Sequence, residues 1–82
     1  MKYTKRQAEY VAFIYYYTKI HRRAPAEHVM MHYFEVSPPS VHQMILNLEK
    51  NGLISRVAGQ ARSIRIAVSE DELAELKKIA DF

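Results

Sequence analysis

The sequence predicts a small α+β domain, because helix-like patterns fill its first part and short strand-like segments follow. In residues 4–51, apolar side chains recur at intervals of three and four, which is typical of amphipathic helices. After Gly52 the pattern changes to short β-branched segments that roughly alternate, which is typical of a β-hairpin. With 82 residues and 49% hydrophobic composition, the chain is expected to form one domain with a single core.

The first helix is predicted to begin after Thr4. Thr4 and Gln7 have the spacing of a capping box, in which each side chain bonds the other residue's backbone N–H. The helix is expected to fade near Ile20, and Pro25 blocks any continuation. Its predicted buried stripe consists of Tyr10, Phe13, Ile14 and Tyr17.

Two further helices are predicted on either side of a short connection. The second runs from 26 to about 34, directly after a proline that suits a helix start, and its expected inward residues are Val29, Met30 and Tyr33. The third has Ser37 as its N-cap and Pro38 at its first position, and it ends before Gly52. Its predicted core stripe consists of Val41, Met44, Ile45 and Leu48.

A hairpin and a last helix complete the chain. Strands are predicted at 53–57 and 62–68, with a Gly-containing turn between them. Ser69 is the expected N-cap of a fourth helix, and Glu72 completes a second capping box. The predicted apolar stripe of this helix consists of Leu73, Leu76, Ile79 and Ala80.

This order of elements is the layout of a winged helix-turn-helix, with three helices, a two-stranded β-hairpin wing and here an added C-terminal helix. We expect residues 1–68 to form a winged-helix DNA-binding domain and residues 69–82 a C-terminal helical extension. An α-helix fits the major groove of DNA, so the third helix would lie there while the hairpin reaches the neighbouring backbone. The fourth helix would fold back on the first helix or pair with its copy in a homodimer.

The charge of the chain is unevenly distributed. Residues 1–68 hold ten basic and four acidic side chains, a net charge of +6, whereas residues 69–82 hold two basic and five acidic ones, a net charge of −3. A basic body suits a polyanionic partner such as nucleic acid. The chain has no cysteine, no signal-like N-terminus and no apolar run that could span a membrane, so we expect a cytoplasmic protein with no membrane partner.

The segment from Ser37 to Ile66 resembles the DNA-binding domain of LexA-type SOS repressors. It shares Ser-Pro at the start of the third helix, Lys-x-Gly-x-Ile at its exit and Gly-x-x-Arg-x-Ile-Arg in the wing. Thr4-x-Arg6-Gln7 and Pro25 also match, so the resemblance covers about residues 4–67. It implies a sequence-specific, double-stranded DNA-binding transcriptional regulator of bacterial type, acting as a repressor and associated with the nucleoid when bound.

Two departures from the family limit what the resemblance implies. The family's repressors carry a C-terminal domain with a Ser/Lys pair that cleaves the linker and mediates dimerisation. This chain ends at Phe82, so we expect no self-cleavage. The third helix has Pro39, His42 and Gln43 where the family typically shows Asn and two Glu, so an SOS-type operator is not implied.

Base contacts are expected from the outward side of the third helix, whose first turns enter the groove. Gln43 can pair bidentately with adenine, and Ser40 can bond more than one base. The full set of expected base contacts consists of Ser37, Pro39, Ser40, His42, Gln43 and Asn47.

Backbone contacts are expected from the hairpin and from the start of the first helix. Arg62, which the resemblance also places on DNA, has the planar guanidinium that suits phosphate, and Gly59 allows close approach of the backbone. Arg22 and Arg23 are weaker candidates for flanking phosphates. The full set of expected backbone contacts consists of Lys5, Arg6, Arg56, Gly59, Gln60, Arg62 and Arg65.

Two other classes of function stay open. Winged helices also serve as protein-interaction modules, and Tyr15, Tyr16 and the acidic C-terminal helix would suit that role. An enzyme would need a metal site at His28 and His32, which share a helix face, but no third ligand accompanies them. We therefore expect no catalysis, no cofactor, no metal and no small-molecule ligand, and double-stranded DNA as the partner.

Overall fold

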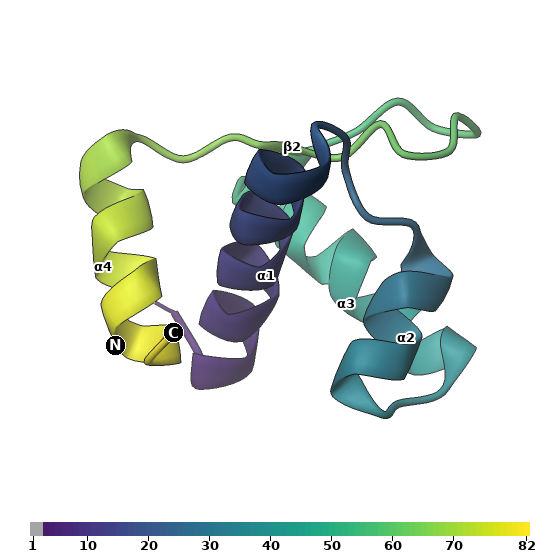
Figure 1. The fold of residues 1–82 in the computed structure, drawn as a ribbon, viewed down its shortest axis with the longest axis horizontal. Helices are drawn as coiled ribbons and strands as arrows, with labels where there is room; N and C mark the ends of the chain where they lie inside the picture. Colours follow the sequence, from purple (N-terminus) through teal and green to yellow (C-terminus); the bar gives the residue numbers. More distant parts are fainter. Residues whose placement is uncertain (1–2) are drawn as a thin grey trace.

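Residues 3–82 fold into four helices and one two-stranded antiparallel sheet, which confirms the predicted α+β class (Figure 1). The computed structural model describes residues 3–82. Its elements are α1 (Lys5–His21), α2 (Glu27–Phe34), α3 (Pro38–Lys50), β1 (Ile54–Ser55), β2 (Arg65–Ile66) and α4 (Glu70–Ala80). Within these residues, no helix has both the length and the apolar character needed to cross a bilayer.

The helix starts follow the local sequence signals. The Thr4 hydroxyl accepts the Gln7 N–H at 3.0 Å, and the Gln7 side-chain oxygen accepts the Thr4 N–H at 2.9 Å, which confirms the capping box of α1. Ser37 caps α3, with Pro38 as its first residue, and Ser69 caps α4. These caps satisfy N–H groups that a helix end leaves unpaired.

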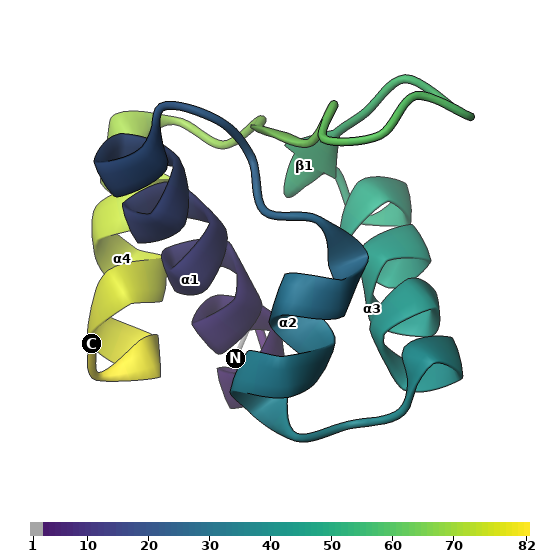
Figure 2. The same ribbon diagram turned by 45° about the vertical axis from the view of Figure 1, so that its right-hand side comes forward.

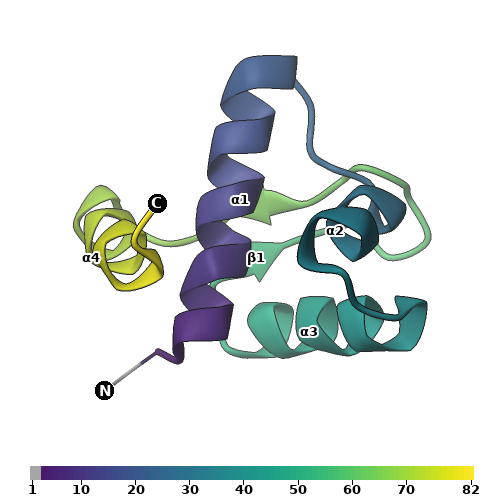
Figure 3. The same ribbon diagram turned by 60° about the horizontal axis from the view of Figure 1, so that its bottom comes forward.

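The predicted stripe on α1 describes only part of its buried surface. Tyr10 and Ile14 are buried as predicted, but Ala8, Val11 and Ala12 are buried as well. Figures 1 and 3 show the reason, because α4 lies along one side of α1 while α2 and α3 lie on the other. A helix covered on two sides needs apolar residues on both, so a single stripe could not describe it.

Helix α4 belongs to the same core. Leu76 is fully buried and Ala80 is nearly so, in agreement with the predicted stripe, while Leu73 and Ile79 pack against the core from its edge. The Tyr3 hydroxyl donates to the Glu72 carboxylate, which ties the segment before α1 to the first turn of α4. Helix α4 folds back on α1, which is the first of the two arrangements expected for it, and its pairing in a homodimer stays a prediction.

The inward side of α2 differs from the prediction. Tyr33, which was expected to face inward, is 54% exposed, whereas Met30 is fully buried. Phe34, four residues after Met30, stacks on Tyr10 with ring centroids 4.0 Å apart, and these two residues define the packed face. Tyr33 instead packs on the outer side of Phe13, with ring centroids 4.4 Å apart. The other residues predicted for the buried sides of the first three helices, Phe13 and Tyr17 on α1, Val29 on α2 and Met44 on α3, are only partly buried.

The strands of the hairpin are much shorter than predicted. Ile54 pairs with Ile66 and Ser55 with Arg65, and the remainder of the predicted segments is irregular. Strand β1 packs beside α3 and β2 beside α1, so the sheet bridges the two helices. Figure 2 shows the long connection between the strands extending away from α1 and α4, on the side of the molecule where α3 lies.

A side chain inside the hairpin explains the short strands. The Ser63 hydroxyl accepts the Val57 N–H at 2.9 Å and lies 2.9 Å from the Gln60 carbonyl oxygen. These bonds replace those that a regular ladder would make, which is how serine side chains compete with sheet structure. Arg62 also has a left-handed backbone, with φ of 57°, which interrupts an extended strand.

Candidate nucleic-acid interface

The outer face of α3 presents polar side chains to solvent. Val41, Ile45 and Leu48 are fully buried on its inner face, so the orientation of the helix is fixed by the core. Every residue predicted to contact bases is exposed, and all of them lie on α3 or at its N-cap: Ser37, Pro39, Ser40, His42, Gln43 and Asn47. The structure therefore brings this predicted set together on one helix.

The two serines of this set bond to each other. The Ser37 hydroxyl accepts the Ser40 N–H at 3.3 Å, and the two hydroxyl oxygens lie 2.9 Å apart. The Ser37 side chain is therefore engaged in capping α3, whereas the Ser40 hydroxyl keeps the freedom to rotate toward another partner.

His42 and Gln43 differ in how they are held. His42 Nδ1 lies 3.4 Å from both carboxylate oxygens of Glu27, so the ring bridges α3 to the start of α2. Gln43 makes no side-chain hydrogen bond to any residue within 3–82, and its amide can both donate and accept. Gln43 is therefore the least constrained polar group on this face.

Asn47 is tied to α1. The Gln7 side-chain amide donates to Asn47 Oδ1 at 2.8 Å, while the same Gln7 closes the capping box of α1. The Asn47 side-chain oxygen is thus occupied in holding α3 against the start of α1. Nothing in the sequence pattern pointed to this bond, because the two residues are 40 positions apart.

Two of the predicted backbone-contacting arginines pair within the protein. Arg6 lies 3.4 Å from the Glu9 carboxylate, and its guanidinium also lies 5.4 Å from the centre of the Phe34 ring. Arg56 Nε donates to the Glu49 carboxylate at 3.1 Å, and the Arg56 side chain is only 20% exposed. Arg56 therefore links the exit of β1 to the last turn of α3. Lys5, beside Arg6, is exposed.

Of the other predicted backbone contacts, Gly59, Gln60 and Arg62 lie on the connection between the hairpin strands, and Arg65 lies on β2. Gly59 has φ of 77°, which favours glycine, and it is exposed together with Gln60, Arg62 and Arg65. Among residues 3–82, neither of these two arginines has a carboxylate within ion-pair distance. They can therefore bind an external anion without first breaking an internal pair.

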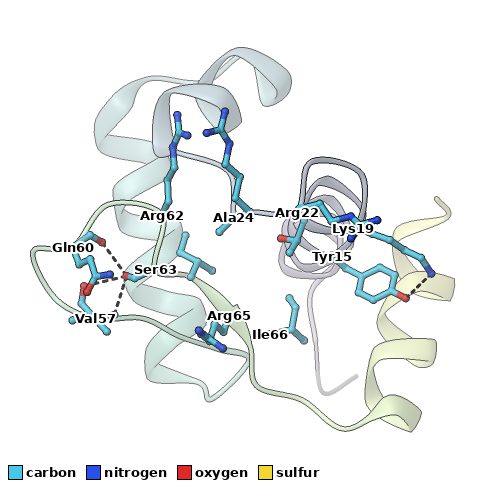
Figure 4. Close-up of a pocket in the computed structure, with 13 residues that line it drawn as sticks. Tyr15, Lys19, Arg22, Ala24, Val57, Gln60, Arg62, Ser63, Arg65 and Ile66 are labelled. Carbon is cyan, nitrogen blue, oxygen red and sulfur yellow. Dashed lines mark hydrogen bonds between the residues drawn. The ribbon is translucent and has the colours of Figure 1, made fainter.

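A groove between the C-terminal end of α1 and the hairpin gathers positive charge. It has a volume of about 830 Å³, and five cationic side chains line it: Lys19, Arg22, Arg23, Arg62 and Arg65. Figure 4 shows the hairpin on one side of this groove and α1 on the other, with the Lys19 ammonium turned toward the Tyr15 hydroxyl. Sequence patterns suggested Arg22 and Arg23 as separate phosphate contacts, but not that the fold sets them beside the hairpin.

The tyrosines proposed as a protein-binding patch contact α4. The Lys77 ammonium lies 4.5 Å from the centre of the Tyr15 ring, and the Tyr16 ring stacks on Phe82 at 6.2 Å. Tyr16 and Phe82 nevertheless remain exposed. In the part of the chain that the structure describes, no three His, Asp or Glu side chains are grouped as metal ligands.

No protein-family model matches this chain, and no curated protein matches its sequence. The resemblance to LexA-type repressors stays a prediction that rests on the residues quoted for it. The geometry of α3 and the hairpin therefore carries the functional argument.

Proposed function

We propose that the protein is a winged helix-turn-helix that binds double-stranded DNA sequence-specifically and acts as a transcriptional repressor. One observation carries the proposal. Helix α3 has an exposed polar face, and directly beside it projects a hairpin whose arginines, Arg62 and Arg65, lack carboxylate partners among residues 3–82. A helix of this width fits the major groove, and unpaired guanidinium groups suit the adjoining phosphates.

The side chains divide into readers and supports. Gln43, with a free amide, is the proposed reader of adenine, and Ser40 is a second reader close to the helix start. Arg62 is the proposed phosphate contact of the wing. Asn47 and Arg56 act in this scheme as supports, because each already holds α3 to another element through a hydrogen bond.

Repression follows from occupancy in this proposal. A bound domain covers its own site and the neighbouring backbone, which excludes other proteins from the same DNA. Helix-turn-helix proteins commonly bind as two-fold dimers, and their half-sites are then separated by one helical turn. A palindromic motif in the selected DNA would thus support a dimer, and a single short motif would support a monomer.

A selection from random duplex DNA tests the proposal. Wild type, Gln43→Ala and Arg62→Ala are each mixed with the pool at two salt concentrations, and the bound fraction is sequenced. Lys78→Gln, on α4, is the control for loss of one positive charge. Wild type should enrich a motif, Gln43→Ala should relax one position of it, and Arg62→Ala should weaken all sequences alike and lower the salt slope by about 1.

Two outcomes would contradict the proposal. One is that wild type enriches no motif at physiological salt. The other is that Lys78→Gln weakens binding as much as Arg62→Ala does, which would show that affinity follows net charge rather than the hairpin.

A further inference from the structure

The groove between α1 and the hairpin differs from the rest of the surface in how its arginines are partnered. The chain has six arginines. Arg6 and Arg56, which do not line this groove, each contact a glutamate. The four that line it, Arg22, Arg23, Arg62 and Arg65, form no ion pair with residues 3–82, and no Asp or Glu lines the groove.

Among residues 3–82, two of the four non-glycine residues with a left-handed backbone line this groove. Arg22 and Arg62 both have left-handed backbones, with φ of 63° and 57°, and they lie on opposite sides of the groove (Figure 4). This conformation suits glycine and is unfavourable for a residue with a long side chain. Arg22 occupies the C-cap of α1, where glycine is the usual residue. Both sides of the groove thus keep a guanidinium at a position where glycine would be more stable.

We infer that this groove binds phosphate groups, at a site separate from the outer face of α3. Four guanidinium groups without ion-pair partners among residues 3–82 make this groove electropositive, and each can donate two parallel hydrogen bonds to phosphate oxygens. The C-terminal end of α1 opposes an anion with about half a negative charge, which four guanidinium groups outweigh. The volume of about 830 Å³ lies within the range of small-ligand pockets.

Two sources can supply this phosphate chemistry. One is the backbone of DNA that flanks the segment contacted by α3, and the other is a free polyphosphate such as that of a nucleotide. The first source rests on the proposed function, in which Arg62 of the hairpin already contacts phosphate, and the groove adds Arg22 and Arg23 to that contact. The second source does not require α3 to read bases.

The test compares single-charge variants of the full chain. The two groove variants are Arg22→Asn, in which asparagine tolerates the left-handed backbone, and Arg65→Gln, which removes a charge on β2. The control is Lys78→Gln, which removes a charge on α4, outside the groove. Circular dichroism checks that each variant is folded. Calorimetric titration with inorganic triphosphate measures the first source, and anisotropy with random-sequence duplexes at several salt concentrations measures the second.

Either of two results supports the inference. Triphosphate binds wild type and each groove variant weakens that binding severalfold, while Lys78→Gln does not; the free polyphosphate is then the source. Alternatively only the duplex binds, and each groove variant lowers the salt slope by about 1 for every sequence, so the DNA backbone is the source.

The inference is overturned if wild type does not bind triphosphate and the groove variants bind duplexes as wild type does. It is also overturned if Lys78→Gln weakens triphosphate binding or lowers the salt slope of duplex binding as much as the groove variants do. Failure of the proposed function is a distinct result. In that case wild type shows no sequence preference, or Gln43→Ala leaves the preference of wild type unchanged. Neither result depends on how the groove variants bind triphosphate or duplex DNA.

Discussion

The Gln7 side-chain amide donates to Asn47 Oδ1 at 2.8 Å, so a single hydrogen bond joins the first turn of α1 to the outer edge of α3. The same Gln7 accepts the Thr4 N–H through its side-chain oxygen. One side chain therefore completes a helix cap and positions the helix proposed to enter DNA. This gives Asn47 a structural role where the sequence predicted a base contact.

Asn47→Ala should lower the free energy of unfolding by about 0.5–1 kcal/mol, the net value of one hydrogen bond. It should weaken selected DNA sequences evenly rather than relax one position of the motif. Urea denaturation measures the first effect and sequencing of bound DNA the second. Gln7→Ala is the matched partner, and in a double-mutant cycle the two losses should not add. If one motif position relaxes in Asn47→Ala and not in Gln7→Ala, the result would support the original prediction that Asn47 contacts a base.

Arg56→Ala should destabilise the protein by about 1 kcal/mol, because it removes both the pair with Glu49 and the packing of a mostly buried side-chain stem. The coupling of Arg56 with Glu49, measured by a double-mutant cycle in chemical denaturation, should be about 0.5 kcal/mol. DNA affinity at low temperature, where the variant is folded, should change less than in Arg62→Ala. An Arg56→Ala variant with wild-type stability and a reduced salt slope would show that this arginine contacts phosphate instead.

Arg22→Gly should raise the free energy of unfolding by about 1 kcal/mol, because glycine relieves the left-handed backbone at the C-cap of α1. Glu35→Gly is the matched control, since Glu35 has φ of 54° at the C-cap of α2 and should give a similar gain. The two variants should differ in anion binding, which falls only in Arg22→Gly. Thermal unfolding with and without inorganic triphosphate separates the two effects. Equal triphosphate binding by both variants would argue against a role for Arg22.

Leu76→Ala should lower the free energy of unfolding by about 3 kcal/mol, because this fully buried side chain of α4 fills the core beside α1. The exposed Glu75→Ala on the same helix should change stability by no more than about 0.5 kcal/mol. Urea denaturation measures both variants. A small effect of Leu76→Ala would mean that α4 contributes little to the core.

Alkaline pH should destabilise the protein in part through Tyr10. Burial raises the pKa of the Tyr10 hydroxyl above its usual value of 10.0, while nearby Arg6 lowers it by a smaller amount. The unfolded chain therefore loses this proton at lower pH than the folded chain, so the stability that Tyr10 contributes is present below pH 10 and lost as the pH rises through the folded pKa.

Denaturation between pH 8 and pH 11 checks this linkage. Tyr10→Phe should lose less stability than wild type on going to about pH 11, because the titrating group is gone. Tyr16→Phe controls for removing one of the other tyrosine hydroxyls. Identical alkaline curves for wild type and Tyr10→Phe would exclude Tyr10 as a cause.

Local sequence signals predicted the features of the fold that depend on neighbouring residues. Thr4, Ser37 and Ser69 begin their helices as predicted, because an N-cap is decided within one turn of the chain. Three of the four residues predicted for the buried stripe of α3 are buried and Met44 is partly buried, since this helix packs on one side only. The exposed polar face of α3, with Gln43 on it, followed from the same periodicity.

Features that depend on contacts between distant segments could not be read from local patterns. The burial of Ala8 and Ala12 and the exposure of Tyr33 arise because helix packing selects which side of a helix is covered. The hairpin strands are shorter than predicted because the Ser63 hydroxyl forms hydrogen bonds with backbone groups that a regular ladder would pair.

The sequence by itself determined the order of the elements, the helix starts and the basic character of residues 1–68, since composition and near neighbours decide these. Only the tertiary structure decided which charged groups are paired. Arg56 pairs with Glu49, whereas Arg22 and Arg62 line the same groove, to which residues 3–82 contribute no carboxylate. Residues this far apart come together only when the core fixes the helices and the hairpin, so the distribution of unpaired charge is a property of the fold.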